Sequence, residues 1–297
     1  MTKLPETLQK LHTFFLENDD LRIFAMSGSR LNRKISDDKF KDWDVIFFTE
    51  NIEKYKQDKQ FLEKFGETLL ITEPDGVGHF YELTYPEMDG YTYLVQYKSG
   101  LRIDFQFMKC ARLEKYFAED SLAKIILDKD GNAPSRIPDD KAYWIKPPAP
   151  EELNYSIKEF YWQFLNTLKA NLRGEFLLAQ FYLNLTRKEC IRLMTWSIAD
   201  KRGFAHNYGK ENTALFQFLE KSDAALLEKS FNSASNEKIN QSLKILAKLE
   251  KKQIDEHSHR LFFSDLDFSG YENIPNDYLI SKDEKTLAEY FKISDGK

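Results

Sequence analysis

Residues 21–48 decide the fold, and their sequence is LRIFAMSGSRLNRKISDDKFKDWDVIFF. The apolar run at 21–26 predicts a buried strand, and the Ser-Gly-Ser at 27–29 predicts a turn that needs a small residue. The apolar run at 45–48 predicts a second buried strand, which the chain enters through the Asp-Trp-Asp at 42–44. One short stretch of chain is therefore expected to form two strands, with a small-residue turn after the first and acidic residues directly before the second.

Elements on both sides of this stretch complete a half of mixed helices and strands. Apolar residues at helical spacing predict an amphipathic helix over about residues 3–18, which is expected to pack on a sheet. Further strands are predicted at 69–71, 91–97 and 101–108. The last two are expected to form an antiparallel hairpin through Ser99-Gly100.

The second half of the chain is expected to be helical. From Glu114 onward the sequence predicts helix and loop, and the proline-rich passage at 146–150 is stiff and extended. Beyond it, apolar residues recur every three or four positions, as in a long core-facing helix. The predicted fold is α+β. A mixed β-sheet domain with flanking helices occupies residues 1–146, and an all-helical bundle domain occupies residues 147–297.

Composition narrows the classes of function. The 297 residues are 42% hydrophobic, and 43 basic against 48 acidic residues give a formal charge of -5. Nucleic-acid binding is disfavoured, because it needs a concentrated basic surface. No apolar run approaches the roughly 20 residues that cross a bilayer, so no membrane partner is expected. The polar start and two distant cysteines are typical of a cytoplasmic protein.

Three acidic residues have the pattern of a metal site. Asp42 and Asp44 are two positions apart, so in an extended chain they project to one side with Cα atoms about 6–7 Å apart. Asp104 interrupts a strand of apolar and aromatic residues, on the face opposite Ile103. Such carboxylates are ligands for Mg²⁺, which is commonly held together with substrate phosphates. The ordinary alternatives are a turn before a strand for the pair, and a surface position or an ion pair with Arg102 for Asp104.

The turn after the first strand is a candidate phosphate site. Ser27, Gly28, Ser29 and Arg30 offer hydroxyls, open backbone N–H groups and a guanidinium, which suit a triphosphate. The alternative is a strand-to-helix turn in which a serine caps the next element. The order of strand, small-residue turn, Asp-x-Asp and later acidic strand is more specific than any single part.

This order resembles the nucleotidyltransferase superfamily of the DNA polymerase β type, and more closely the aminoglycoside 6-adenylyltransferases, also called streptomycin adenylyltransferases. The similarity covers about residues 20–220 and rests on Ser27-Gly28-Ser29-Arg30, Asp42-Trp43-Asp44, Arg102-Ile103-Asp104, Leu127-Asp128-Lys129-Asp130-Gly131, Trp144-Ile145-Lys146-Pro147-Pro148, Glu159-Phe160-Tyr161-Trp162, Met194-Thr195-Trp196 and Gly209-Lys210. The resemblance implies transfer of AMP from ATP to a hydroxyl of a streptomycin-like aminoglycoside, which releases pyrophosphate and inactivates the antibiotic.

The resemblance also implies roles for single residues at the nucleotide. Asp42 and Asp44 would hold Mg²⁺ against ATP, and Asp104 would be a third ligand or would accept the proton of the attacking hydroxyl. The turn residues 27–30 would contact phosphate oxygens. Lys210 would reach the leaving pyrophosphate, and a solvated lysine after a glycine is the alternative there.

The cationic acceptor would lie against Glu159, Trp162 and Glu175. The alternatives are an aromatic stripe of a helix core and a helix N-terminus at Glu175. Two other functions stay open: a nucleotidyltransferase of the same fold acting on a protein or another small molecule, and a catalytically silent nucleotide-binding regulator. Retention of the three carboxylates favours an enzyme. The sequence leaves open ATP against GTP, the hydroxyl modified and the oligomeric state.

Overall fold

The computed structural model describes residues 4–35, 38–76, 82–85, 88–131, 133–257 and 273–275. The chain divides into two compact units with separate cores, Met1–Tyr143 and Trp144–Lys297, called the sheet unit and the helical unit below. The sequence predicts this division after residue 146. Residue 3, where the first helix is expected to start, lies outside the described residues.

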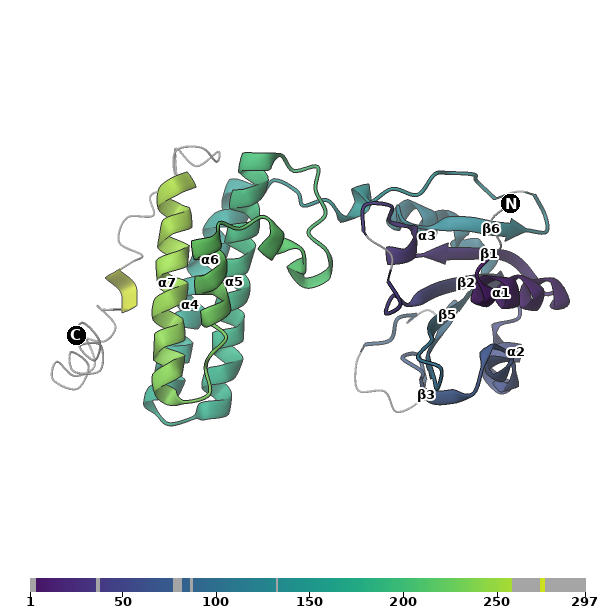
Figure 1. Cartoon of the computed structure of the whole chain (residues 1–297), viewed down its shortest axis with the longest axis horizontal. Coiled ribbons are helices and arrows are strands. Elements are labelled where there is room, and N and C mark those ends of the chain that lie inside the picture. The colour runs from purple at the N-terminus through teal and green to yellow at the C-terminus, as the bar shows by residue number, and fades with distance from the viewer. Residues whose placement is uncertain are drawn as a thin grey trace. The chain divides into compact units, whose positions relative to one another are not determined.

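The sheet unit is built on six strands in the order β3-β4-β5-β2-β1-β6. They are β1 (Leu21–Ser27), β2 (Trp43–Thr49), β3 (Thr68–Thr72), β4 (Gly90–Tyr97), β5 (Arg102–Met108) and β6 (Lys124–Asp128) (Figure 1). β2 and β5 pair in parallel, and the other neighbouring strands pair antiparallel. The predicted mixed sheet and the β4–β5 hairpin are therefore confirmed.

Helices pack on both faces of the sheet. α1 (Glu6–Glu17) and α2 (Ile52–Gln57) share an aromatic core with alternate residues of β1, β2 and β5, among them Phe24, Phe47 and Phe107. α3 (Leu113–Glu119) shares a second cluster with Ile46 and Met108 on the opposite face. Because side chains alternate along a strand, Asp44 and Asp104 lie on this α3 face.

Residues 124–128 correct a prediction. The sequence predicts helix and loop after Glu114, but the chain forms α3 and then β6, which pairs antiparallel with β1. A short apolar run such as Lys124–Asp128 has no strong preference of its own, and the edge of β1 gives it hydrogen-bonding partners. The strand is therefore set by tertiary pairing.

The helical unit contains α4 (Pro150–Leu172), α5 (Phe176–Arg202), α6 (Lys221–Lys229) and α7 (Asn236–His257) (Figure 1). These helices pack around one apolar core. The sequence predicts helices after the sheet, and the structure has them there. Pro150 is the first residue of α4, where a missing N–H costs nothing. Within the described ranges no helix combines the length and the apolar character needed to cross a membrane.

One ionisable side chain lies in the middle of the helical core. Glu250 of α7 is 0% exposed, and neither of its carboxyl oxygens has a hydrogen-bond partner among the described residues. Burial raises its pKa well above the usual carboxyl range, and the charge of Glu189 adds to this effect. Burial therefore favours the protonated, neutral form of the Glu250 carboxyl in the folded protein.

Candidate active site

The acidic positions of β2 and β5 lie next to each other. In the parallel pairing of these strands, Asp44 and Asp104 are direct partners. Asp44 is also the partner of Ser27 at the end of β1. Asp42 lies one residue before β2. The sheet register therefore brings together the small-residue turn and acids from two strands that are distant in the sequence.

Arg102 connects two of the three acids. Its Nε and Nη2 donate to the two carboxylate oxygens of Asp104, each at 2.9 Å. Its Nη1 lies 3.4 Å from Oδ2 of Asp42. The ordinary alternative for Asp104, an ion pair with Arg102, is therefore present, and it includes Asp42 as well.

Asp44 lies in a negative environment. Its pKa is raised to about 6, first by burial and then by the charges of Asp104 and Asp42, while Arg102 acts in the opposite direction. Positive charge added next to such a group stabilises its ionised form. The carboxylate oxygens fit Mg²⁺ in chemistry, but among the described residues no group of three or more acidic, His or Cys side chains is arranged so that it could hold a metal ion. Arg102 supplies the positive charge in this arrangement.

Gly28 allows the turn to approach Asp44. Its φ is +76°, and a Cβ at this position would overlap Asp44 Oδ2 and lie 2.9 Å from Asp44 Cγ. Ser29 begins a short 3₁₀ turn, Ser29–Leu31. Two features therefore explain the predicted need for a small residue at this position. The backbone is left-handed, and the Asp44 carboxylate lies against it.

Arg30 contacts the chain that carries the acids. Its Nε donates to the backbone oxygen of Asp42 at 2.9 Å, and its Nη2 donates to the backbone oxygen of Lys41. Its guanidinium also stacks 4.4 Å from the ring centroid of Trp43. These contacts position the entry to β2. The expected contact of Arg30 with phosphate stays a prediction.

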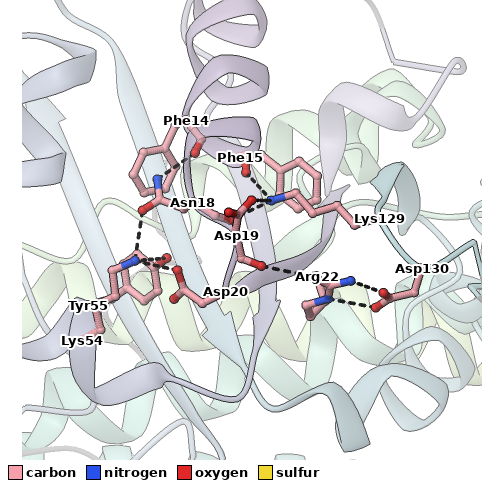
Figure 2. A network of polar contacts seen from close by, with 10 residues as sticks. All are labelled: Phe14, Phe15, Asn18, Asp19, Asp20, Arg22, Lys54, Tyr55, Lys129 and Asp130. Atoms are coloured by element: carbon pink, nitrogen blue, oxygen red, sulfur yellow. Dashed lines mark hydrogen bonds and ion pairs between the residues drawn. The ribbon is translucent and has the colours of Figure 1, made fainter.

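The segment at 127–131 has a structural role at the end of α1 (Figure 2). Lys129 Nζ donates to the backbone oxygens of Phe15 and Asn18, at 3.1 and 2.8 Å. A cation there stabilises the C-terminal end of a helix. Asp130 accepts two hydrogen bonds from Arg22 of β1. These residues, which contributed to the family resemblance, therefore tie β6 to α1 and β1.

The predicted acceptor residues are separated along the helical unit. Trp162 of α4 is 65% exposed, so it is not part of the core stripe formed by Phe160 and Phe164. Glu159, one turn away, accepts a hydrogen bond from Gln163 at 2.6 Å. Glu175 lies beyond the end of α4, about 15 Å of helix from Trp162.

The structure therefore brings Glu159 and Trp162 together but not Glu175. Glu175 precedes α5 directly and forms a 2.6 Å ion pair with Arg173. This is the helix N-terminus that the sequence offers as its alternative role.

Lys210 lies at the start of a short turn in the helical unit. It is exposed and begins the 3₁₀ segment Lys210–Asn212 after Gly209, whose φ is +78°. Glu211 and Asn212 also have positive φ values, of 54° and 58°. For Arg102, the sequence offers the ion pair with Asp104, but no local signal indicates its contact with Asp42, because that contact depends on the register of β2 against β5.

Comparison with known proteins agrees with the motif resemblance. The chain matches the family described as Streptomycin adenylyltransferase over residues 1–268. It is 33% identical to an aminoglycoside 6-adenylyltransferase of Staphylococcus aureus over 250 residues, which make up 83% of this chain and 87% of that protein. It is 32% identical to an aminoglycoside 6-adenylyltransferase of Bacillus subtilis (strain 168) over 210 residues, 69% of this chain and 72% of that protein.

A solved structure is similar over the whole chain. The crystal structure of an aminoglycoside 6-adenyltransferase from Bacillus subtilis covers 98% of this chain and 99% of its own, with 23% identity and a TM-score of 0.45. The family match and the two sequence relatives are the stronger findings, because they extend over most of the chain. From them it follows that the chain belongs to the streptomycin adenylyltransferase family and is a nucleotidyltransferase.

Proposed function

We propose that this protein transfers AMP from ATP to a hydroxyl of an aminoglycoside, in a Mg²⁺-dependent reaction that releases pyrophosphate and inactivates the antibiotic. Streptomycin or a close relative is the expected acceptor, because the matching family is described by that drug. The relatives from Staphylococcus aureus and Bacillus subtilis are described as aminoglycoside 6-adenylyltransferases.

The observation that carries the proposal is the register of the sheet. Asp44 and Asp104 are paired across β2 and β5, and the Gly28 turn lies against Asp44. A small-residue turn next to paired carboxylates would combine a phosphate site with a cation site. Nucleotidyl transfer needs both in one place, because the reacting nucleotide brings its own negative charge.

Asp42, Asp44 and Asp104 would hold the metal. When bound, Mg²⁺ supplies positive charge that offsets the negative charge of the phosphates and of these carboxylates. Arg102 now donates to Asp104 and contacts Asp42. A carboxylate has about four lone-pair sites, so these two side chains can accept from Arg102 and still offer oxygen lone pairs to a metal.

The reaction itself is a displacement at the α-phosphorus of ATP. The acceptor oxygen forms a bond to this phosphorus, the bond to the bridging oxygen of the β-phosphate breaks, and pyrophosphate leaves. A carboxylate takes the proton of the hydroxyl, and Asp104 is our candidate for either this role or that of a ligand. The chain contributes mainly alignment and charge, since phosphoryl-type transfers need little covalent work from protein.

The acceptor is a polycation, and an exposed ring next to a carboxylate suits it. Trp162 is 65% exposed, and Gln163 donates a hydrogen bond to the Glu159 carboxylate one helical turn away. Cation–π attraction and charge pairing would act on the same amino group. This pair supports a cationic substrate of the aminoglycoside class.

The test measures pyrophosphate release from ATP and Mg²⁺, with and without each member of an aminoglycoside panel that includes streptomycin. Release should depend on the drug, and the modified drug should gain one AMP by mass spectrometry. Asp44→Asn should lower the rate by about 10²-fold or more, because it removes charge at the reacting phosphate. Glu53→Gln, which changes an exposed acid of α2, is the matched control and should keep the wild-type rate.

Other outcomes would refute the proposal in identifiable ways. If no panel member supports release but a protein becomes labelled with AMP, the enzyme acts on a protein. If ATP binds and AMP is transferred to nothing, the chain is a nucleotide-binding regulator. If Asp44→Asn and Glu53→Gln are equally active, the reaction takes place elsewhere.

A further inference from the structure

One edge of the sheet is apolar and exposed. β3 is the last strand in the order of the sheet, so its outer edge has no strand partner among the described residues (Figure 1). The five residues of this strand carry no charge. Leu69 and Leu70 are each 63% exposed, and Ile71 is 36% exposed. The outer edge of such a strand presents backbone N–H and C=O groups that can pair with another strand.

The opposite edge of the same sheet differs from β3 in its charge. β6 begins with the exposed Lys124 and ends with Asp128. Charged side chains on an edge strand, above all lysines, discourage pairing with other strands. β3 has no charged residue within its bounds. Its pairing with β4 shifts register at the start, between Thr68 and Leu70, and is regular from Leu70 to Thr72.

The sequence around β3 is almost the same in both directions. Residues 67–73 are Glu-Thr-Leu-Leu-Ile-Thr-Glu, with Leu70 at the centre. Two copies of one strand that pair antiparallel about a two-fold axis use the same surface twice, so each residue faces its mirror position. Apolar residues then face apolar residues and threonine faces threonine, and both kinds of pair stabilise an antiparallel sheet. With the axis at Leu70, the facing pairs are Leu70 with Leu70, Leu69 with Ile71, and Thr68 with Thr72.

The acids at both ends of this segment are paired with lysines of the same subunit. Glu67 forms an ion pair with Lys98. Glu73 forms a 2.6 Å ion pair with Lys59 and accepts a hydrogen bond from the Tyr91 hydroxyl at 2.8 Å. The axis at the centre of β3 brings Glu67 of one copy opposite Glu73 of the other. The repulsion between these two acids is offset by the two lysines, because each end then has no net charge.

We propose that β3 pairs with β3 of a second copy of this chain, antiparallel about a two-fold axis at Leu70. The two six-stranded sheets then form one continuous sheet through main-chain hydrogen bonds, as in β-strand addition. Because side chains alternate along a strand, Leu69 and Ile71 of both copies form one apolar cluster on one face of this sheet.

The length of β3 sets the expected strength of this interface. A standard interface buries about 800 Å² on each partner, and a strand of about 17 Å does not reach this area alone. The dimer is therefore weak, and its population depends on the protein concentration. The candidate active site on β2 and β5 is not part of this edge, so the inference does not depend on the proposed function.

Disulfide formation between single cysteines tests the register. The variants are made in the full chain with Cys110→Ser, since Cys190 is buried. Residues that face each other in an antiparallel pair have Cα atoms about 4.5–5.5 Å apart, within reach of a disulfide. Leu70→Cys lies on the axis and should crosslink to its copy. Thr72→Cys is the control from the same strand. Its copy lies four residues along the strand, about 13 Å away, so it should not crosslink in a non-reducing gel.

Sedimentation equilibrium of the full chain at about 1–100 µM measures the dimer itself. The wild type should change from monomer towards dimer across this range. Leu70→Lys should raise the dissociation constant by about tenfold, because two facing lysines replace the central apolar pair. Leu177→Lys makes the same change at an 83% exposed leucine of α5 and should dimerise as the wild type does. Circular dichroism checks that both variants are folded.

Three results would overturn the proposal. The first is a wild type that stays monomeric over the whole range. The second is equal crosslinking of Leu70→Cys and Thr72→Cys, which would indicate random collision or another register. The third is a dimer that Leu177→Lys weakens and Leu70→Lys does not, since the copies would then associate through the helical unit. None of these results bears on AMP transfer, which the pyrophosphate assay measures separately.

Discussion

Replacing Gly28 by alanine tests whether the turn after β1 supports the Asp44 carboxylate. The substitution has two separate costs. A Cβ in the left-handed region is strained, and at this position it would also overlap Asp44 Oδ2 and lie 2.9 Å from Asp44 Cγ. Asp44 must therefore rotate away, which changes the position of a candidate metal ligand.

Gly100→Ala is a matched control from the same unit. Gly100 has a φ of +84°, close to the +76° of Gly28, but a Cβ there would meet nothing within 4 Å. In both variants the strained backbone lowers the free energy of unfolding by about 1–2 kcal/mol. In Gly28→Ala the displacement of Asp44 from its rotamer lowers it by about 0.5–1.5 kcal/mol more. We expect losses of about 1.5–3.5 kcal/mol for Gly28→Ala and about 1–2 kcal/mol for Gly100→Ala.

Urea denaturation followed by circular dichroism measures the free energy of unfolding, and drug-dependent pyrophosphate release measures activity. A reacting group displaced by about 1 Å costs about 10²-fold in rate. Gly28→Ala should therefore lose activity on this scale, while Gly100→Ala should keep it. If the two variants lose the same stability and both remain active, the contact between Gly28 and Asp44 does not support the site.

Three further predictions concern ionisable groups. Lys129→Met removes the cation at the end of α1 and should lower the free energy of unfolding, measured in urea, by about 1–2 kcal/mol. The control variant Lys124→Met should not lower it, and equal effects of the two substitutions would contradict the role of Lys129. Arg102→Met leaves two carboxylates without their counter-ion, so the protein in EDTA should unfold at a lower temperature than the wild type. Mg²⁺ should bring the unfolding temperature back up. A loss that Mg²⁺ does not reverse would argue against a shared metal site. Because burial raises the pKa of Glu250, the folded protein keeps a proton that the unfolded chain releases above its ordinary pKa of 4.5. Stability should fall as pH rises above that value, by up to about 1.4 kcal/mol per pH unit, and Glu250→Leu should remove this slope in urea denaturation; an unchanged slope would contradict it.

The centre of the sheet unit could be predicted because its signals are local. The apolar runs of β1 and β2, the glycine after β1 and the alternation in β5 each span a few residues, and the structure has strands there. The sequence also suggests the ion pair of Arg102 with Asp104. The contact of Arg102 with Asp42 could not be foreseen, because it depends on pairing between strands that the chain order leaves undetermined.

The features that the sequence did not indicate depend on distant partners. β6 is a strand because β1 has an edge to pair with, although its own five residues carry a weak signal. Arg187 occupies an ordinary position of an amphipathic helix, and its burial requires Ser230 and Phe231, more than forty residues later. The spacing of Glu159 and Trp162 indicated a shared helix face, but the exposure of Trp162 depends on how α4 packs.

The pairing of β6 with β1 also has a consequence for the order of synthesis. Lys129 Nζ donates to the backbone oxygen of Phe15, which lies 114 positions earlier in the chain. The ribosome therefore synthesises Lys129 long after Phe15. Until about residue 130 has emerged, the first strand of the nascent protein has one edge unpaired and the first helix lacks its terminal cation. The sheet unit therefore completes its folding only after nearly all of it has been translated, and until then this edge is open to pairing with other strands.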